Sequence, residues 1–156
     1  MTDKRLHQVV NTMLFGDATS DHVFLIRRWL HELGFDSEIY AQHCDSALKN
    51  EVQEFDIDQL KDEPAVVFHH TMGSDALAEL AKNEVPLILI YHNITPPVFF
   101  SDANVEFIEE LNWGRQQLQD IRPITRLALS DSPYSREELA ALGYENAAVL
   151  PIVLDE

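Results

Sequence analysis

Three histidines follow apolar runs of the kind that form buried strands. His69 and His70 end the run AVVFHH, and His92 comes directly after LILIY. An imidazole ring can transfer a proton near neutral pH, or hydrogen bond to charge that develops on a reacting substrate. Histidines at two strand ends therefore indicate acid–base chemistry or the binding of a polar substrate.

Small and polar residues occupy the other loops of this kind. FGDATSDH follows the first apolar run, TMGSD follows the histidine pair, and NITPP follows the last histidine. Helices expected to begin near residues 20, 74 and 134 would point free backbone N–H groups toward these loops, which favours an anionic or phosphate-bearing ligand. The candidate binding residues in the loops are Gly16, Asp17, Ser74, Asn93 and Thr95.

Each candidate also has a plainer interpretation. A histidine at a strand end is often a hydrogen-bonded structural residue, and Gly16-Asp17 can be only a turn. For the pair His69-His70 we expect one ring to point inward and the other outward. No carboxylate or cysteine accompanies the histidines at ligand spacing, so no metal site is expected. Arg115, within a helical pattern, is predicted to be a solvated surface residue.

The elements that carry these residues alternate between strand and helix. The strands at 65–68 and 87–90 are apolar on both faces, as expected of parallel strands covered by helices. The class predicted is therefore α/β: a Rossmann-like, doubly wound, mainly parallel sheet in a single domain. In such a sheet ligands bind at the carboxyl ends of the strands, where these loops would meet. Strands are predicted near 6–13, 37–41, 65–69, 86–91, 125–130 and 147–153, and helices near 20–33, 74–82, 102–121 and 134–142.

Composition narrows the classes of partner. The 156 residues include 27 acids and 11 bases, a net charge of −16 that disfavours nucleic acid and anionic membranes. Cys44 is the single cysteine, which fits a reducing compartment. The longest apolar run, Val85 to Tyr91, is too short to span a bilayer. Polar residues interrupt the N-terminal apolar run, so it cannot be the hydrophobic core of a signal peptide. We expect a cytoplasmic protein with no transmembrane segment.

Several well-known sites are excluded by their missing motifs. The chain has no G-x-G-x-x-G after its first strand, no G-x-x-x-x-G-K-[ST] and no G-x-S-x-G. The segment Gln42–Glu63 carries the weakest pattern; a short helix and a loop are predicted there, without a function.

The loops together resemble a known family. The stretches FGDATSDHVFLIRRWLHELGFDSEIYA, VFHHTMGSDALAEL, LILIYHNITPPVFF, WGRQQL and ALSDSPYSREELAALGY followed by VLPIVLD, in this order, resemble the N-terminal half of GT-B glycosyltransferases of family 4. The run Tyr-His-Asn-Ile-Thr-Pro is the most specific part of the resemblance. In that family two Rossmann-like domains face each other across a cleft; the N-terminal one mainly holds the acceptor and the C-terminal one the nucleotide-sugar donor.

The resemblance implies a role for each candidate. Gly16-Asp17 corresponds to the loop that approaches the donor phosphates and the transferred sugar, His92 to the histidine beside the reacting sugar, and His69-His70 to the histidine-bearing loop before it. Residues 1–156 would then be the N-terminal domain of a retaining glycosyltransferase, inactive without its C-terminal donor-binding domain, which is absent from this chain. No cofactor is implied. The partners implied are a nucleotide-sugar donor, an acceptor glycan or small hydroxyl compound, and that second domain.

Two other functions remain open from the sequence. The chain could be a stand-alone sugar- or nucleotide-binding module without catalysis, which would bind its ligand without another domain. It could also be a structural or interaction domain, which would present a large apolar surface and no ligand contacts.

Overall fold

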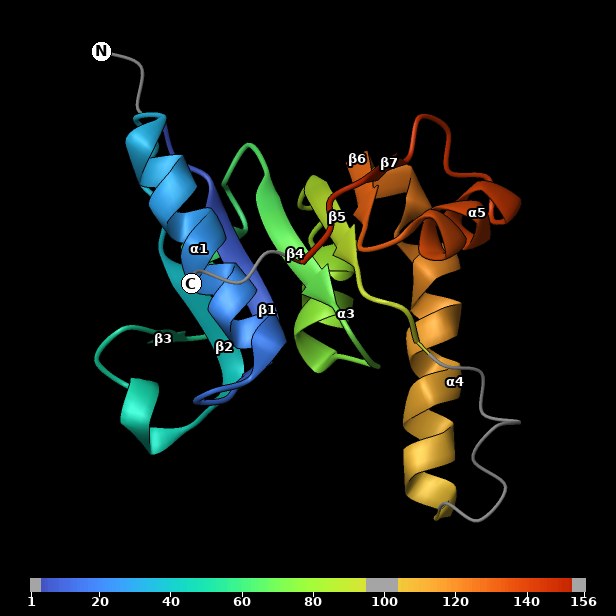
Figure 1. Ribbon diagram of the computed structural model, residues 1–156, viewed down its shortest axis with the longest axis horizontal. Coiled ribbons are helices and arrows are strands. Elements are labelled where there is room, and N and C mark those ends of the chain that lie inside the picture. Colours follow the sequence, from blue (N-terminus) through green and yellow to red (C-terminus); the bar gives the residue numbers. More distant parts are fainter. Residues whose placement is uncertain (1–3, 95–103, 153–156) are drawn as a thin grey trace.

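Seven parallel strands form one sheet in the order β3-β2-β1-β4-β5-β6-β7 (Figure 1). The computed structural model describes residues 4–94 and 104–152. The chain starts in the centre at β1, builds outward through β2 and β3, then returns to build the other side from β4. The switch point between β1 and β4 is where such sheets open a crevice. The strands are β1 (His7–Met13), β2 (Ile39–Cys44), β3 (Gln53–Glu54), β4 (Val66–His70), β5 (Leu87–Tyr91), β6 (Thr125–Ser130) and β7 (Ala148–Val149).

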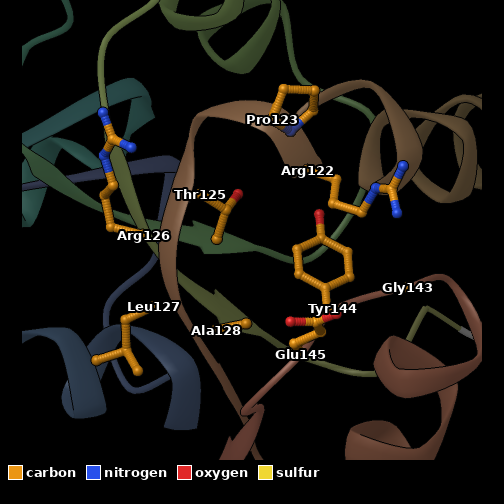
Figure 2. A pocket seen from close by; sticks show the side chains of 9 residues that line it. All are labelled: Arg122, Pro123, Thr125, Arg126, Leu127, Ala128, Gly143, Tyr144 and Glu145. Carbon is orange, nitrogen blue, oxygen red and sulfur yellow. The ribbon is translucent and has the colours of Figure 1, made fainter.

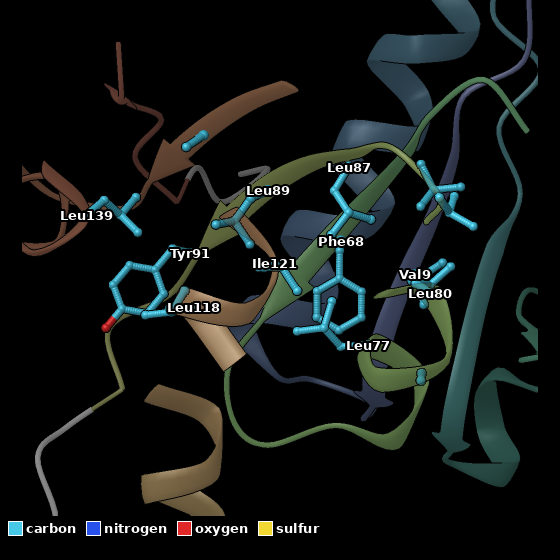
Figure 3. Close-up of a cluster of buried hydrophobic side chains, with 14 of the residues drawn as sticks. Val9, Phe68, Leu77, Leu80, Leu87, Leu89, Tyr91, Leu118, Ile121 and Leu139 are labelled. Carbon is cyan, nitrogen blue, oxygen red and sulfur yellow. The ribbon is translucent and has the colours of Figure 1, made fainter. Parts of the chain in front are cut away.

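Helices cover both faces of this sheet. The helix α1 packs against one face, where Val23 and Ile26 meet side chains of β1, β4 and β5. On the other face, shown in Figure 3, Phe68 and Leu89 pack with residues of the later helices, including Leu118. The helices are α1 (Ala18–Glu32), α2 (Ile57–Leu60), α3 (Asp75–Lys82), α4 (Val105–Asp120) and α5 (Pro133–Ala141), with short 3-10 turns η1 (Ser46–Leu48) and η3 (Arg122–Ile124).

The predicted fold class is confirmed, with one strand more than the sequence indicated. β3 lies in the segment Gln42–Glu63, beside β2 at the edge of the sheet. Its two residues, Gln53 and Glu54, are both polar and exposed. A strand this short, with no buried face, leaves no alternating apolar pattern in the sequence. In the described part of the chain, no helix combines the length and apolar character that crossing a membrane requires.

Capping side chains set the starts of the helices at the carboxyl edge of the sheet. The Asp17 carboxylate accepts a hydrogen bond from the backbone N–H of Ser20, 3.0 Å away, so α1 begins two residues earlier than predicted. Ser74 caps α3 and Ser132 caps α5 in the same way. The first turns of α1, α3 and α5 therefore all lie beside the loops that carry the candidate residues.

Gly114 lets α4 approach the loop that follows β4. A methyl group at this position would lie 2.7 Å from the backbone nitrogen of Gly73 and 2.9 Å from the backbone carbon of Met72. The close approach is to this loop, whose Gly73 N–H donates to the carbonyl of Glu110 at 3.2 Å.

Gly114→Ala should therefore destabilise the fold by about 1 kcal/mol, because overpacking costs roughly 1–3 kcal/mol and the ~1 kcal/mol by which alanine favours a helix offsets only part of that cost. Urea unfolding measures the change. Asn112→Ala, on the exposed face of the same helix, is the control and should stay within about 0.5 kcal/mol of the wild type. A Gly114→Ala variant as stable as the wild type would show that the contact with Gly73 is not tight.

Candidate functional site

Side-chain alternation separates the two histidines that end β4. His69 is in register with Val10 of β1 and Ile90 of β5, so it faces α1. His70 points to the opposite face, toward α4. His92, two residues beyond Ile90, shares the face of His69. The ring of His69 therefore lies on the same face as His92, and the ring of His70 lies on the opposite face of the sheet.

Three imidazole rings meet on the α1 side at the carboxyl edge. The rings of His69 and His92 stack with their centroids 6.0 Å apart and their planes at 17°. His22, in the second turn of α1, stands edge-on to His92 with centroids 6.4 Å apart. We call His22, His69 and His92 the histidine cluster. Its members come from α1, β4 and the end of β5, beside the switch point of the sheet.

His69 has a fixed tautomer. Its Nε2 lies 2.8 Å from Oε1 of Gln8, whose Nε2 in turn donates to the carbonyl of Val23 at 3.1 Å. Because the amide oxygen of Gln8 is the acceptor, His69 carries its proton on Nε2. Nδ1 has no hydrogen-bond partner among the described residues. Burial lowers the pKa of His69 well below its ordinary value, and His92 and His22 lower it further, so the ring is neutral at pH 7.

His92 is held by its backbone more than by its ring. Its N–H donates to the carbonyl of His70 at 3.0 Å, but neither ring nitrogen has a hydrogen-bond partner within the described residues. Nδ1 lies 3.8 Å from Oδ2 of Asp131, too far for a hydrogen bond. Burial lowers the pKa of His92 to about 4, although the charges of Asp131 and Asp17 oppose the shift. A buried, neutral imidazole without a partner is costly to keep, which indicates a use beyond packing.

His70 lies in the contact between β4 and α4. Its Nε2 donates to the carbonyl of Gly114 at 2.7 Å, and the ring is fully buried. Burial lowers its pKa to about 4, so this ring is also neutral at pH 7. Its observed contact ties α4 to the sheet, away from the histidine cluster.

The remaining candidates lie around the same edge in different settings. Gly16 sits in the exposed loop after β1 with φ = 76°, a conformation that favours glycine. The side chain of Ser74 is buried and accepts from the backbone N–H of Leu77, as the cap of α3. Asn93 is exposed beside His92. Thr95 lies outside the described residues.

Comparisons with known proteins agree with this architecture. No protein-family model matches the chain, and no curated protein sequence matches it significantly. The similar solved structures include several of an alpha-glucosyltransferase. One, in complex with UDP-glucose and DNA containing an abasic site, gives a TM-score of 0.64 at 10% identity over 99% of this chain. Another, with UDP and a 13-mer DNA containing a HMU base, gives 0.62 at 11% identity over 99% of this chain.

The chain has the fold of a GT-B half-domain. It spans 44% of the length of each of these two structures. A third, the alpha-glucosyltransferase in complex with UDP, gives a TM-score of 0.58 at 9% identity, with 97% of this chain and 44% of that one covered. At such low identity the likeness establishes the fold, and the chemistry has to be argued from the residues of this chain.

The chain contains polar residues at the carboxyl edge of its sheet that sequence reasoning missed. The ring of His22 stands edge-on to the ring of His92, and the carboxylate of Asp131 lies 3.8 Å from its Nδ1. Asp131 directly follows β6, so the strand-end rule that singled out His92 could have found it. His22 could have been found only by knowing that the second turn of α1 faces β5. The prediction that Arg115 is a solvated surface residue is wrong. Its side chain is only 33% exposed and donates a hydrogen bond to the carbonyl of Ile94.

An open hollow of about 430 Å³ lies beside the amino end of β6, opposite the carboxyl ends of the strands (Figure 2). It is lined by residues at the amino end of β6, including Thr125, and by the loop after α5, including Tyr144. Since parallel strands place all their carboxyl ends at one edge, this hollow is separate from the histidine cluster. In the two stretches that the structure describes, no group of three histidine, cysteine or acidic side chains is arranged to hold a metal ion.

Proposed function

We propose that this chain is the N-terminal, acceptor-side domain of a glycosyltransferase that moves a sugar from a nucleotide-sugar donor to an acceptor hydroxyl. The observation that carries the proposal is His92, a buried and neutral imidazole at the carboxyl edge of a GT-B half-domain, with no hydrogen-bond partner among the described residues. The UDP and UDP-glucose complexes of the similar structures support a nucleotide-sugar donor. The resemblance of the loops to family 4 supports transfer with retention.

The environment of His92 favours hydrogen bonding over proton transfer. With a pKa of about 4 the ring is a weak base at pH 7. The carboxylate of Asp131, 3.8 Å from Nδ1, favours the tautomer with its proton on that nitrogen and leaves Nε2 as an acceptor. Nε2 is buried in this structure, so it would accept from a hydroxyl of the transferred sugar once the residues around it give way to the donor. Such a hydrogen bond increases the electron density on the sugar hydroxyl oxygen. This stabilises the positive charge that develops on the sugar ring during glycosyl transfer.

The bond changes then need no protein base. The acceptor oxygen forms a bond to the anomeric carbon on the same face from which the diphosphate leaves. The bond from that carbon to the diphosphate breaks, and the proton of the acceptor hydroxyl passes to the departing diphosphate. His92 orients the sugar and stabilises its charge, while Gly16 and Asp17 border the path of the donor phosphates.

A second domain would cover the carboxyl edge. Phe15, in the loop after β1, is 73% exposed, and Leu14 beside it and Tyr134 in the first turn of α5 are also exposed. These apolar side chains lie around the loops that carry the candidate residues. We propose that the C-terminal, donor-binding domain of the same enzyme packs over them. Phe99 and Phe100, which follow the NITPP loop in the sequence, lie outside the described residues.

The acceptor is proposed to be a glycan or a small hydroxyl compound. Several of the similar structures contain DNA, so a nucleic-acid acceptor is the natural rival. The net charge of −16 argues against it, because a DNA-binding surface has to neutralise phosphates with lysine and arginine. The single cysteine and the nucleotide-sugar donor fit an enzyme of the cytoplasm.

Titration with UDP-glucose tests the assignment. The full-length protein, with its second domain, should bind and turn over a nucleotide sugar, whereas the 156-residue chain should show no turnover and bind at least 100-fold more weakly, because half of the cleft is missing. Calorimetry measures the binding, and release of UDP measures the turnover. Equal affinity of the chain and the full-length protein, without turnover by either, would support the stand-alone binding module.

A further inference from the structure

A closed ring of hydrogen bonds lies directly after His92. The backbone N–H of Ile94 donates to the hydroxyl of Tyr91 at 3.1 Å, and the carbonyl of Ile94 accepts from a guanidinium nitrogen of Arg115 at 2.6 Å. The other terminal nitrogen of Arg115 donates to Oε2 of Glu138 at 2.8 Å. The second carboxylate oxygen of Glu138 accepts from the Tyr91 hydroxyl at 3.5 Å, which completes the ring.

This ring is mostly buried and joins three elements. Tyr91 and Ile94 are inaccessible to solvent, and the side chain of Glu138 is 16% exposed. Tyr91 belongs to β5, Arg115 to α4 and Glu138 to α5. A guanidinium that donates from one nitrogen to a carboxylate and from the other to a carbonyl has fixed geometry, because its N–H groups are coplanar. Both polar backbone groups of Ile94 are therefore held by side chains rather than by a sheet or a helix.

The ring determines the path of the turn that carries His92. The turn enters from β5, where the N–H of His92 donates to the carbonyl of His70, and it leaves through Ile94. The imidazole of His92 has no hydrogen-bond partner among the described residues. Its orientation therefore depends on the backbone of this turn and on the imidazole of His69 stacked against it. Glu138 also ties α5 to the turn, and the loop before α5 carries Asp131. Both members of the His92–Asp131 pair thus lie on segments that the ring connects.

We propose that Arg115 is a positioning residue that holds the turn of His92, and with it the distance between His92 and Asp131, through Ile94 and Glu138. The proposal rests on the proposed function for its consequence in catalysis, while its structural part can be tested in the 156-residue chain without any substrate. Arg115 contacts neither the ring of His92 nor the reacting atoms, so its effect is indirect.

The structural test is amide hydrogen exchange and histidine NMR on the 156-residue chain. Arg115→Met keeps the apolar stem and removes both donated hydrogen bonds; it should increase the exchange rate of the Ile94 amide at least tenfold and shift the ring resonances of His92. Arg115→Lys, which can reach one acceptor at a time, should restore part of the protection. Arg136→Met, an exposed arginine of α5, is the matched control and should change neither signal. Unchanged Ile94 exchange and His92 resonances in Arg115→Met would overturn the proposal.

A second variant and a kinetic measurement keep the outcomes distinct. If Arg115→Met does not fold, Tyr91→Phe removes the acceptor for the Ile94 amide and the donor to Glu138 but leaves both hydrogen bonds of Arg115. The His92 resonances should then stay near their wild-type positions, because Arg115 still holds the carbonyl of Ile94; a large shift would show that Tyr91 rather than Arg115 holds the turn. In the full-length enzyme, Arg115→Met should lower kcat about tenfold with KM changed less than twofold. If the NMR signals change and kcat does not, the positioning stands as structure while the catalytic role of His92 fails. If kcat falls and the NMR signals do not change, Arg115 acts otherwise and the proposal is overturned.

Discussion

In the proposed full-length glycosyltransferase, His92→Phe should lower kcat/KM about 100-fold, the size of loss that follows removal of one positioned hydrogen-bonding group from a transition state. The same change should leave the free energy of unfolding unchanged or slightly higher. Neither ring nitrogen of His92 has a hydrogen-bond partner in the described part of the chain, so an apolar ring of similar shape removes a desolvation cost and no bond. Alanine would obscure this, because His92 is only 6% exposed and its truncation would leave a cavity.

Two other histidines provide matched comparisons. His70→Phe loses the hydrogen bond to the carbonyl of Gly114, so it should destabilise the fold by about 1–3 kcal/mol. His43→Phe, at an exposed position of β2, should change neither turnover nor stability by a measurable amount. Steady-state kinetics and urea unfolding of the three variants separate the roles. If His92→Phe keeps wild-type turnover, or unfolds as His70→Phe should, His92 is a structural residue.

The positions of the strands followed from apolar runs, because a parallel strand covered on both faces has little choice but to be apolar. Val66 to Phe68 and Leu87 to Ile90 are such runs, and both formed central strands. β3 left no comparable signal, since its burial is minimal and its pairing depends on where β2 ends. Sequence patterns report burial well, and they report an edge strand of two polar residues poorly.

The gathering of His69 and His92 at one edge followed from strand polarity alone. Which ring of the pair His69-His70 would face His92 depended on the register between β4 and β5, which periodicity within a single strand does not determine. The contacts of Arg115 were hidden for a related reason. The helical pattern around Arg115 carries no information about its partners, Ile94 and Glu138. They lie 21 and 23 residues away and meet Arg115 only after α4 and α5 have docked.

Acidification from pH 7 to pH 5 should destabilise the chain by about 4 kcal/mol through His70 and His92 together. Burial lowers the pKa of each to about 4 in the folded chain, against about 6.5 for an unfolded histidine. Below pH 6.5 the unfolded chain binds protons at these two positions and the folded chain does not, so unfolding becomes more favourable as the pH falls. Each residue contributes about 2 kcal/mol over this range, and His69, whose pKa burial also lowers, adds to the loss.

Urea unfolding at pH 7, 6 and 5 measures this dependence above the range in which most carboxylates titrate. His92→Phe should remove about 2 kcal/mol of the pH-dependent loss, and the double variant His70→Phe, His92→Phe about 4 kcal/mol. Leu89→Ala, a core variant that removes no titrating group, should lower the stability equally at all three pH values. If the double variant loses as much stability between pH 7 and pH 5 as the wild type, the protons are taken up elsewhere and the two rings are not held neutral by burial. If the loss falls by the expected amount and only the share of His69 remains, the same burial that keeps His92 from acting as a base at pH 7 is what makes the domain sensitive to acid.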